Sequence, residues 1–380
     1  MKIKSLITEF ITSEKSGGFI LIGCTAFSLI IANSSLFVYY QNIWQYVIQG
    51  HIVTDWINDG LMAIFFLLVG LELKREIQEG ALSNLKSALL PIISAMGGVI
   101  IPASIFLFFN IGKSTQNGAG IPMATDIAFT LGMLALAGKR IPVNLRIFLT
   151  ALAVIDDLCA ILVIAVFYTE QISLFYLGIT AVLFLLLLTL NKLKVSFLWM
   201  YIVIGISMWF TLLHSGIHAT LAGVLLAIAL PSEKKNNQSI SNNVQHYLHF
   251  PVALIVIPLF ALANTCIIFS SNWHHGLFST ASLGIILGLF IGKPAGIFIF
   301  SWLAVLFGIC QLPPAIKWKH IFGAGILAGI GFTMSIFICL LAFSNQQQIQ
   351  EAKIAIIIGS SLSALLGIAY LRISTKKDSN

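Results

Sequence analysis

Three acidic residues stand inside otherwise apolar stretches of this sequence. Asp126 ends the run Gly118-Ala-Gly-Ile-Pro-Met-Ala-Thr-Asp, and Asp156 and Asp157 are adjacent within the apolar run 151–161. A carboxylate at membrane depth is costly, so such a residue is a functional-site hypothesis by default. A purely structural role would require cationic partners, and we place only Lys293 equally deep in the sequence. One lysine cannot neutralise three aspartates, which favours a functional site.

The adjacent aspartates suit the exchange of one ion for another. Neighbouring residues of a helix point about 100° apart, so Asp156 and Asp157 can border one cavity. Burial and a nearby like charge both favour the protonated form of a carboxyl group. Once deprotonated, the same group offers hard oxygen ligands, which suit a small alkali cation. Competition between protons and a cation for the same oxygens is the minimal chemistry of an exchanger.

Two glycine-rich segments, 119–137 and 320–343, are predicted to be broken helices in opposite halves of the chain. Such a pair often marks a transporter's binding site, although close helix packing through small residues is the alternative. Asp126 would offset the positive N-terminal ends at the breaks, and Lys293 the negative C-terminal ends. Alternatively, Lys293 pairs with one of the aspartates, which we prefer. Thr125 could lend its hydroxyl to the ion or satisfy backbone in the break.

Five further residues are candidates for a response to pH. Glu72 and Glu76 are spaced i, i+4 at one end of a span, and His246 and His249 lie at the start of another. Histidine titrates near physiological pH, so a carboxylate and histidine cluster beside an ion pathway can sense pH. Solvated surface is the alternative interpretation for both groups. His218, near the outer end of the predicted span 216–231, is either a structural residue or the fifth member of this pH-responsive group.

These residues must be positioned by membrane-spanning helices. The chain has 380 residues, of which 58% are hydrophobic and 9% charged, whereas a soluble domain carries roughly a quarter charged residues. Apolar runs of about twenty residues indicate helices rather than barrel strands. We therefore predict an all-α polytopic membrane protein, with residues 1–380 forming one transporter domain. Its approximate spans are 18–34, 56–73, 88–109, 119–137, 147–168, 173–190, 195–213, 216–231, 249–269, 281–307, 320–343 and 353–372, about twelve in number.

The positions of Lys and Arg predict the orientation. With both termini in the cytoplasm, all but three of the 21 basic residues face inward; Lys113 and Lys353 face outward, and Lys293 lies within a span. The basic residues are scattered rather than gathered into a patch, so no nucleic acid partner is expected. The five cysteines are odd in number and show no metal-binding spacing.

The chain resembles the NhaA family of bacterial Na⁺/H⁺ antiporters. The resemblance covers nearly the whole sequence and rests on ordered motifs: Trp56-Ile-Asn-Asp-Gly-Leu-Met-Ala, Phe65-Phe-Leu-Leu-Val-Gly-Leu-Glu, Ala124-Thr-Asp-Ile-Ala-Phe, Ala153-Val-Ile-Asp-Asp-Leu, Gly292-Lys-Pro and Gly329-Ile-Gly-Phe-Thr-Met-Ser. It implies twelve spans with inverted repeats, broken helices in spans four and eleven that cross at mid-membrane, and a homodimer among lipids of the bacterial inner membrane. It also implies electrogenic export of Na⁺ or Li⁺ in exchange for external protons, two for each cation, which would control intracellular pH and sodium. No cofactor is expected.

The resemblance also implies residue roles. Asp156 and Asp157 would bind Na⁺ or Li⁺ and protons, Asp126 and Lys293 would balance charge and couple the two ions, and Thr125 would lie beside the ion. The pH-responsive residues would be Glu72, Glu76, His246 and His249, with an influence from His218. The sequence departs from the family pattern at Gln245, where an acidic residue is expected, at Cys159, usually Gly, and at His214, usually Lys.

Three other functions remain open from the sequence. A proton-coupled carrier of another cation or small solute would use the same deep carboxylates. An intramembrane aspartyl protease also uses two membrane aspartates, but on separate helices, whereas Asp156 and Asp157 are contiguous. A channel would conduct sodium without coupling it to protons. We predict the antiporter.

Overall fold

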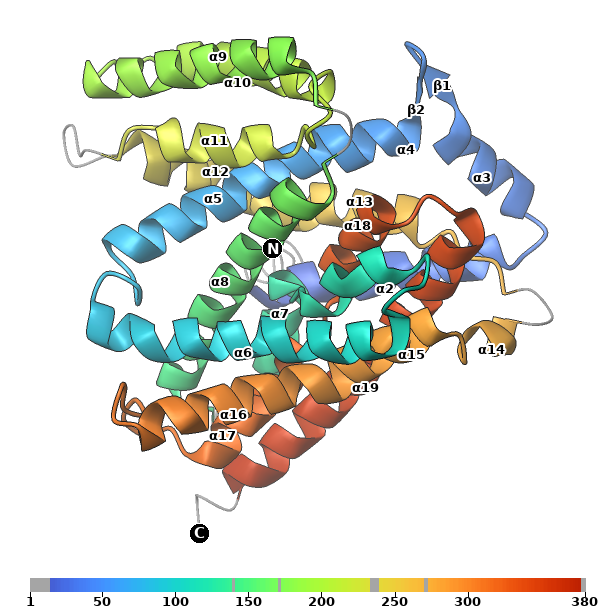
Figure 1. The fold of residues 1–380 in the computed structure, drawn as a ribbon, viewed down its shortest axis with the longest axis vertical. Helices are drawn as coiled ribbons and strands as arrows, with labels where there is room; N and C mark the ends of the chain where they lie inside the picture. The colour runs from blue at the N-terminus through green and yellow to red at the C-terminus, as the bar shows by residue number, and fades with distance from the viewer. Residues whose placement is uncertain (1–13, 139–140, 170–171, 233–238, 270–272, 377–380) are drawn as a thin grey trace, which may run out of the picture.

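The computed structural model describes residues 14–138, 141–169, 172–232, 239–269 and 273–376, and these are almost entirely helical (Figure 1). One short hairpin interrupts the helices, formed by strands β1 (Val47–Ile48) and β2 (His51–Ile52) in antiparallel register. Its two turn residues, Gln49 and Gly50, have φ of 51° and 87°, as in the tight turns that match strand twist. The predicted inward-facing residues Lys2, Lys4, Lys139, Arg140, Lys234, Lys235 and Lys377 lie outside the described residues.

Every predicted span coincides with helix. By length and hydropathy, eight helical segments of the described chain can cross a membrane, or ten if each of two bent pairs is one span. One shorter apolar helix, α10, accompanies them. The figure of twelve spans stays a prediction. The bounds are α2 (Glu14–Ala32), α3 (Phe37–Gln45), α4 (Val53–Asp55), η1 (Trp56–Leu61), α5 (Met62–Gln78), α6 (Leu85–Asn110), η2 (Gln116–Met123), α7 (Ile127–Ala137), α8 (Val143–Phe167), α9 (Leu174–Lys192), α10 (Leu198–Leu213), α11 (Leu221–Ala229), α12 (Ile240–Pro251), η3 (Val252–Val256), α13 (Ile257–Asn264), α14 (Trp273–Gly276), α15 (Thr280–Leu287), η4 (Gly288–Gly292), α16 (Lys293–Leu306), α17 (Trp318–Ala328), α18 (Phe332–Ala342) and α19 (Gln346–Lys376).

The two predicted helix breaks are confirmed. In the fourth span the 3₁₀-helix η2 ends at Met123 and α7 begins at Ile127, while residues 124–126 are not helical. In the eleventh span α17 and α18 are bent by 49° around residues 329–331. The backbone N–H of Asp126 donates to Ile330 O at 2.7 Å, so the two breaks touch. The relation of the two halves by inverted repeats stays a prediction.

Wide π-helical turns occur where two other spans contain proline. The π-helix η4 directly precedes Lys293-Pro294, and η3 directly precedes Ile257-Pro258. Proline lacks an N–H, and its ring clashes with the carbonyl four residues earlier in a regular α-helix. A wider turn relieves this clash without ending the helix. The site lysine therefore sits at the junction between a π-helix and the start of α16.

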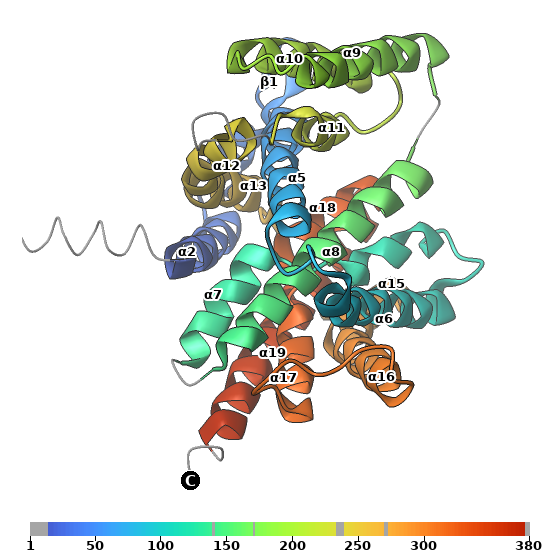
Figure 2. The same cartoon turned by 90° about the vertical axis from the view of Figure 1, so that its left-hand side faces the viewer.

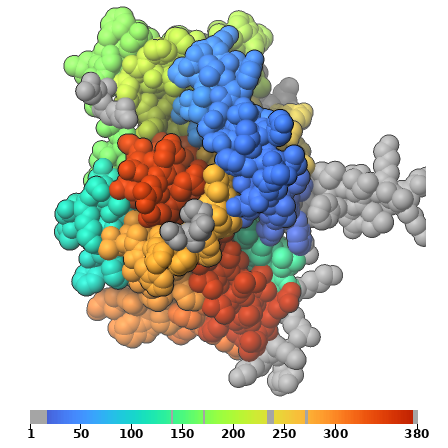
Figure 3. All heavy atoms as spheres, turned by 90° about the vertical axis from the view of Figure 1, so that its right-hand side faces the viewer, coloured from blue at the N-terminus to red at the C-terminus, as the bar shows by residue number. Residues whose placement is uncertain are grey.

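The helices form two packed regions. The larger core surrounds α8, which contacts α5, α6, α7 and α17 and runs obliquely through the molecule (Figure 2). The smaller core joins α9, α10 and α11 to one face of α5, with α9 and α10 as the outermost layer (Figure 1). On another face, α2 and α3 lie beside C-terminal segments (Figure 3), where Ser28 Oγ donates to Leu262 O at 3.0 Å. α5 thus belongs to both cores.

The closest backbone approach around α16 predicts a specific sensitivity. A Cβ atom at Gly296 on α16 would lie 2.1 Å from Gly97 O on α6, whereas one at Gly178 on α9 would meet nothing within 4 Å. Gly296→Ala should force the two helices apart and lower stability by about 1–3 kcal/mol. Gly178→Ala should leave stability unchanged or raise it slightly. Thermal unfolding in detergent would compare the two variants, and equal midpoints would contradict this packing.

Candidate functional site

The two helix breaks satisfy each other's backbone groups. Thr125 Oγ1 donates to Ala328 O at 3.0 Å, at the C-terminal end of α17. In return, Ser335 Oγ of α18 donates to Ile121 O of η2 at 2.7 Å. Thr125 and Ser335 are both 0% exposed. Since hydrocarbon offers no water to bind free carbonyls, these side chains replace the hydrogen bonds that each break removes.

Asp126 joins the N-terminal ends of two helices. Its Oδ1 accepts the N–H of Phe129 at 2.9 Å, which makes it the N-cap of α7. Its Oδ2 accepts both the N–H of Thr333 at 3.1 Å and Thr333 Oγ1 at 2.5 Å, in the first turn of α18. The carboxylate therefore faces the positive ends of α7 and α18 at once. This geometry matches the charge compensation that the sequence predicts for Asp126.

Lys293 combines the two arrangements that the sequence left open. Its Nζ lies 3.0 Å from Asp156 Oδ2 and donates to the carbonyl of Met123, the last residue of η2. The lysine is 0% exposed. It thus pairs with an aspartate and also caps the C-terminal end of a half-helix.

Asp156 and Asp157 differ in their surroundings, although both are 1% exposed. Asp156 Oδ2 accepts Thr125 Oγ1 at 2.6 Å in addition to its ion pair with Lys293. Asp156 Oδ1 and both oxygens of Asp157 have no hydrogen-bond partner among the described residues. A buried charged oxygen without a partner is strongly unfavourable, so these three oxygens are suited to accept protons or a hard cation.

A cavity of about 270 Å³ reaches α8 at Val154, one helical turn before Asp157, although neither aspartate is among its lining residues. It is lined by residues of α5, α7, α8, α12, η3 and α13. Its polar lining comprises Glu72, Arg75, Glu76, Arg146, Thr150, Gln245 and His249. The structure therefore gathers Glu72, Glu76 and His249 around one cavity.

The structure separates the other two pH candidates from this cavity. His246 is exposed and is not among the residues that line it. His218 lies just before α11, and its Nε2 is 2.8 Å from the carbonyl of Tyr168, which ends α8. Tyr168 is eleven residues beyond Asp157, or about 16 Å along the helix. His218 therefore fastens the far end of the helix that carries the aspartates.

The residues that depart from the family pattern lie at different distances from the aspartates. Gln245 is 6% exposed and lines the 270 Å³ cavity, so the missing acidic group changes the charge of that cavity. Cys159 is half-buried, three residues beyond Asp156 on α8. His214 is exposed and lies against the rings of Phe210 and Tyr176.

Sequence reasoning missed two features of the buried polar network. The role of Thr333 as partner of Asp126 was not predicted, although the motif Gly329-Ile-Gly-Phe-Thr-Met-Ser contains it. The burial of Lys353 was not predicted either, while its position on the outer side stays a prediction. Lys353 is 7% exposed and lies near Cys266 and Cys339, because α19 begins at Gln346, two turns earlier than the predicted span. Lys293 is therefore not the only buried lysine.

Comparison with known proteins gives one consistent family. The family model described as Na⁺/H⁺ antiporter 1 matches residues 8–371. The chain is 55% identical to Na⁺/H⁺ antiporter NhaA 1 of Flavobacterium johnsoniae over 372 residues, covering 98% of each protein. It is 52% identical to NhaA of Cytophaga hutchinsonii, covering 99% of this chain and 97% of the relative. Identity to NhaA of Vibrio cholerae is 45%, with 98% of each covered.

The contact between Asp126 and Thr333 predicts a stability effect. Thr333→Val keeps the side-chain shape but removes the hydroxyl donor, leaving the buried carboxylate short of one hydrogen bond. We expect a loss of about 1–3 kcal/mol. Thr333→Ser retains the hydroxyl and serves as the matched control. Thermal unfolding of both variants in the same detergent measures the effect, and a Thr333→Val protein as stable as Thr333→Ser would refute the assigned contact.

Proposed function

The chain belongs to the NhaA family of Na⁺/H⁺ antiporters, and we propose that it exports Na⁺, and also Li⁺, in exchange for protons bound at Asp156 and Asp157. Two findings support the proposal. Homologous antiporters are 55% and 52% identical to this chain over 98% and 99% of its length. Three buried carboxylate oxygens of the pair lack hydrogen-bond partners among the described residues.

The unpartnered carboxylate of Asp157 is the observation that carries the proposal. Its two oxygens can hold a proton or ligate a cation, but not both at once, so the two ions exclude each other. Asp156 is bound to Lys293, and a cation at the pair would compete with the ammonium group for Asp156 Oδ2. Because Asp156 is already ionised in this pair, the two exchanged protons would come from Asp157 and from Lys293, whose counter-charge the cation shares. Two protons exchanged for one Na⁺ move one net positive charge inward, so the membrane potential drives sodium out.

Thr125 and Asp126 act differently in this proposal. The hydroxyl of Thr125 lies 2.6 Å from Asp156 Oδ2, close enough to serve as a neutral oxygen ligand. Both oxygens of Asp126 accept hydrogen bonds from helix N-termini, so this residue fixes the crossing of the breaks. The same bonds argue against a protease, because Asp126 has no free oxygen with which to share a water with Asp157.

Access to the site would come through the 270 Å³ cavity. We assign its wall of Glu72, Glu76 and His249 to the pH response, with His246 and His218 as outlying contributors. Alternating access would follow from movement of helices around the crossed breaks. A single transporter domain, a homodimer, the bacterial inner membrane and cytoplasmic termini complete the proposal by family resemblance.

Proton flux in everted vesicles tests the exchange. Respiration acidifies the lumen, a pH-reporting dye follows it, and Na⁺, Li⁺ or K⁺ salts are added between pH 6.5 and 9. Wild type should alkalinise the lumen with Na⁺ and Li⁺ but not K⁺. Asp157→Asn should lose at least nine tenths of this response, because it removes the exchangeable charge. Glu79→Gln, at an exposed end of α5, is the control and should behave as wild type. Alkalinisation by another cation or solute alone would instead support the alternative carrier.

The cavity lining predicts that the two neighbouring histidines differ. His249 lines the cavity together with Glu72, Arg75 and Glu76 of α5 and Arg146 of α8, whereas His246 does not line it. A protonated imidazole beside the cavity opposes cation entry. His249→Ala should therefore extend sodium-dependent exchange to lower pH, by about half a unit.

The same vesicle assay measures this shift as the pH of half-maximal response. His246→Ala, on the same helix but outside the cavity lining, is the matched comparison and should shift the profile less than His249→Ala does. Equal shifts in the two variants would argue that general surface charge, rather than the cavity, sets the pH response.

A further inference from the structure

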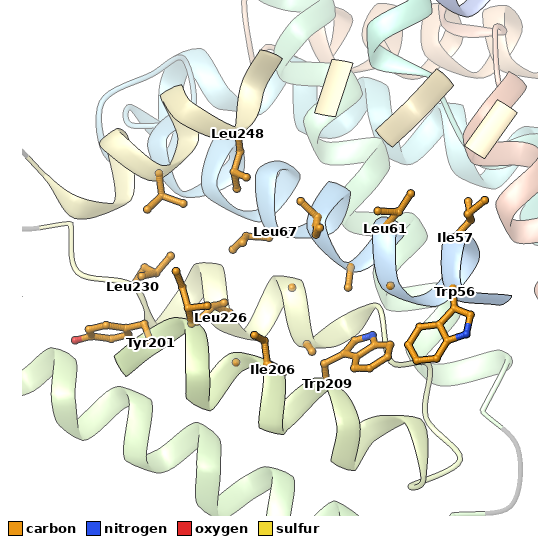
Figure 4. Close-up of a pocket in the computed structure, with 18 of the residues that line it drawn as sticks. Trp56, Ile57, Leu61, Leu67, Tyr201, Ile206, Trp209, Leu226, Leu230 and Leu248 are labelled. Atoms are coloured by element: carbon orange, nitrogen blue, oxygen red, sulfur yellow. The ribbon is translucent and has the colours of Figure 1, made fainter. Parts of the chain in front are cut away.

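A second, wholly apolar cavity forms a groove away from the aspartates. Its volume is about 690 Å³, and it lies between α5 on one side and α10 and α11 on the other, with α12 at one end (Figure 4). Tyr201 and Leu230 stand at one end and Trp56 and Trp209 at the other, with Leu226 and Ile206 between them. We call it the α5–α10 groove.

The groove offers no polar group to an occupant. The three lining side chains that carry a polar atom direct it to backbone carbonyls. Trp56 Nε1 donates to Ile48 O at 3.2 Å, Trp209 Nε1 to Asp59 O at 3.0 Å, and the Tyr201 hydroxyl to Val195 O at 3.2 Å. The remaining lining residues are aliphatic or glycine. An occupant of this groove must therefore be a hydrocarbon.

The groove opens toward the surroundings of the protein. Ile206 and Ile202 on α10 are 61% and 45% exposed, and Ile64 on α5 is 37% exposed. Because these helices belong to a membrane protein, the surroundings are lipid chains. The groove volume of 690 Å³ is far larger than the volume that one water molecule occupies in the liquid, about 30 Å³. A space of this size does not remain empty, because protein interiors are close-packed.

The length of the groove fits one leaflet. On α10 the lining extends from Leu198 to Trp209, eleven residues or about 16 Å at 1.5 Å per residue. This is about half of the 30 Å hydrocarbon thickness of a bilayer. From the apolar lining, the opening and the length, we propose that an acyl chain of a membrane phospholipid occupies the α5–α10 groove.

The chain would support a wall of the ion pathway from behind. α5 contributes Ala63, Ile64 and Leu67 to the groove, and Leu68 and Glu72 to the 270 Å³ cavity. One helix thus separates the lipid chain from the polar cavity. Occupancy of the groove does not depend on which ions the protein exchanges.

Photo-crosslinking tests the proposal directly. The full chain is reconstituted into phosphatidylcholine vesicles containing a phospholipid with a diazirine in its acyl chain, and labelled residues are mapped by peptide mass spectrometry after illumination. Ala63 and Leu67 of α5 line the groove and are partly exposed, so a chain lying in the groove can reach them. We expect labelling there in addition to the outer face of α9, at Val182 and Leu185, which are 65% and 60% exposed.

A pair of glycine variants provides the control. A Cβ atom at Gly60 in the groove, or at Gly178 on α9, meets nothing within 4 Å. Gly60→Phe should fill the groove and reduce labelling of Ala63 and Leu67 at least fivefold, while Gly178→Phe should leave it unchanged. Labelling of α9 without labelling of Ala63 and Leu67 in wild type would overturn the proposal, even if Gly60→Phe failed to fold. Undiminished labelling in a folded Gly60→Phe protein would do so as well.

Discussion

Backbone hydrogen bonding at the two helix breaks is the constraint on which the rest of the site depends. Each break exposes carbonyl and N–H groups in a part of the molecule that water does not solvate, and each such group costs several kcal/mol if it is left unpaired. Asp126 accepts hydrogen bonds from two helix N-terminal ends, Lys293 donates to the carbonyl of Met123, and Ser335 donates to that of Ile121. The Thr125 hydroxyl shares its one proton between the carbonyl of Ala328 and Asp156 Oδ2. The crossing of spans four and eleven is stable because these side chains are present.

This division of hydrogen bonds leaves Asp157 without a structural task. Both oxygens of Asp126 accept hydrogen bonds at helix ends, and Oδ2 of Asp156 contacts Lys293 and Thr125. Asp157, the next residue of the same helix, points about 100° away and escapes these partners. The network that holds the breaks together therefore leaves one carboxylate without a hydrogen-bond partner among the described residues, and this is the carboxylate to which we propose that the exchanged ion binds.

α5 links the site to the periphery of the molecule. One face packs in the core around α8 and lines the polar cavity, and the opposite face packs on α11 and borders the α5–α10 groove. α5 and α11 can pack this closely because residue 223 of α11 is glycine. A Cβ atom at Gly223 would lie only 2.1 Å from Ala63 O of α5. The position of Glu72 in the cavity thus depends on packing on the far side of its helix.

Composition, hydropathy and the glycine-rich segments sufficed to predict a helical membrane protein with two broken helices, since lipid restricts the chain to a few local solutions. The deep residues Asp126, Asp156, Asp157 and Lys293 were likewise visible, because charge inside an apolar run is rare and costly. The sequence did not show which of these residues pair with which partners. The contact of Thr333 with Asp126 joins residues 207 positions apart, and the burial of Lys353 depends on where α19 begins. Such partnerships, and the separation of His249 from His246 at the cavity, arise only when helices pack, because spacing along one helix fixes a face but not the neighbour that covers it.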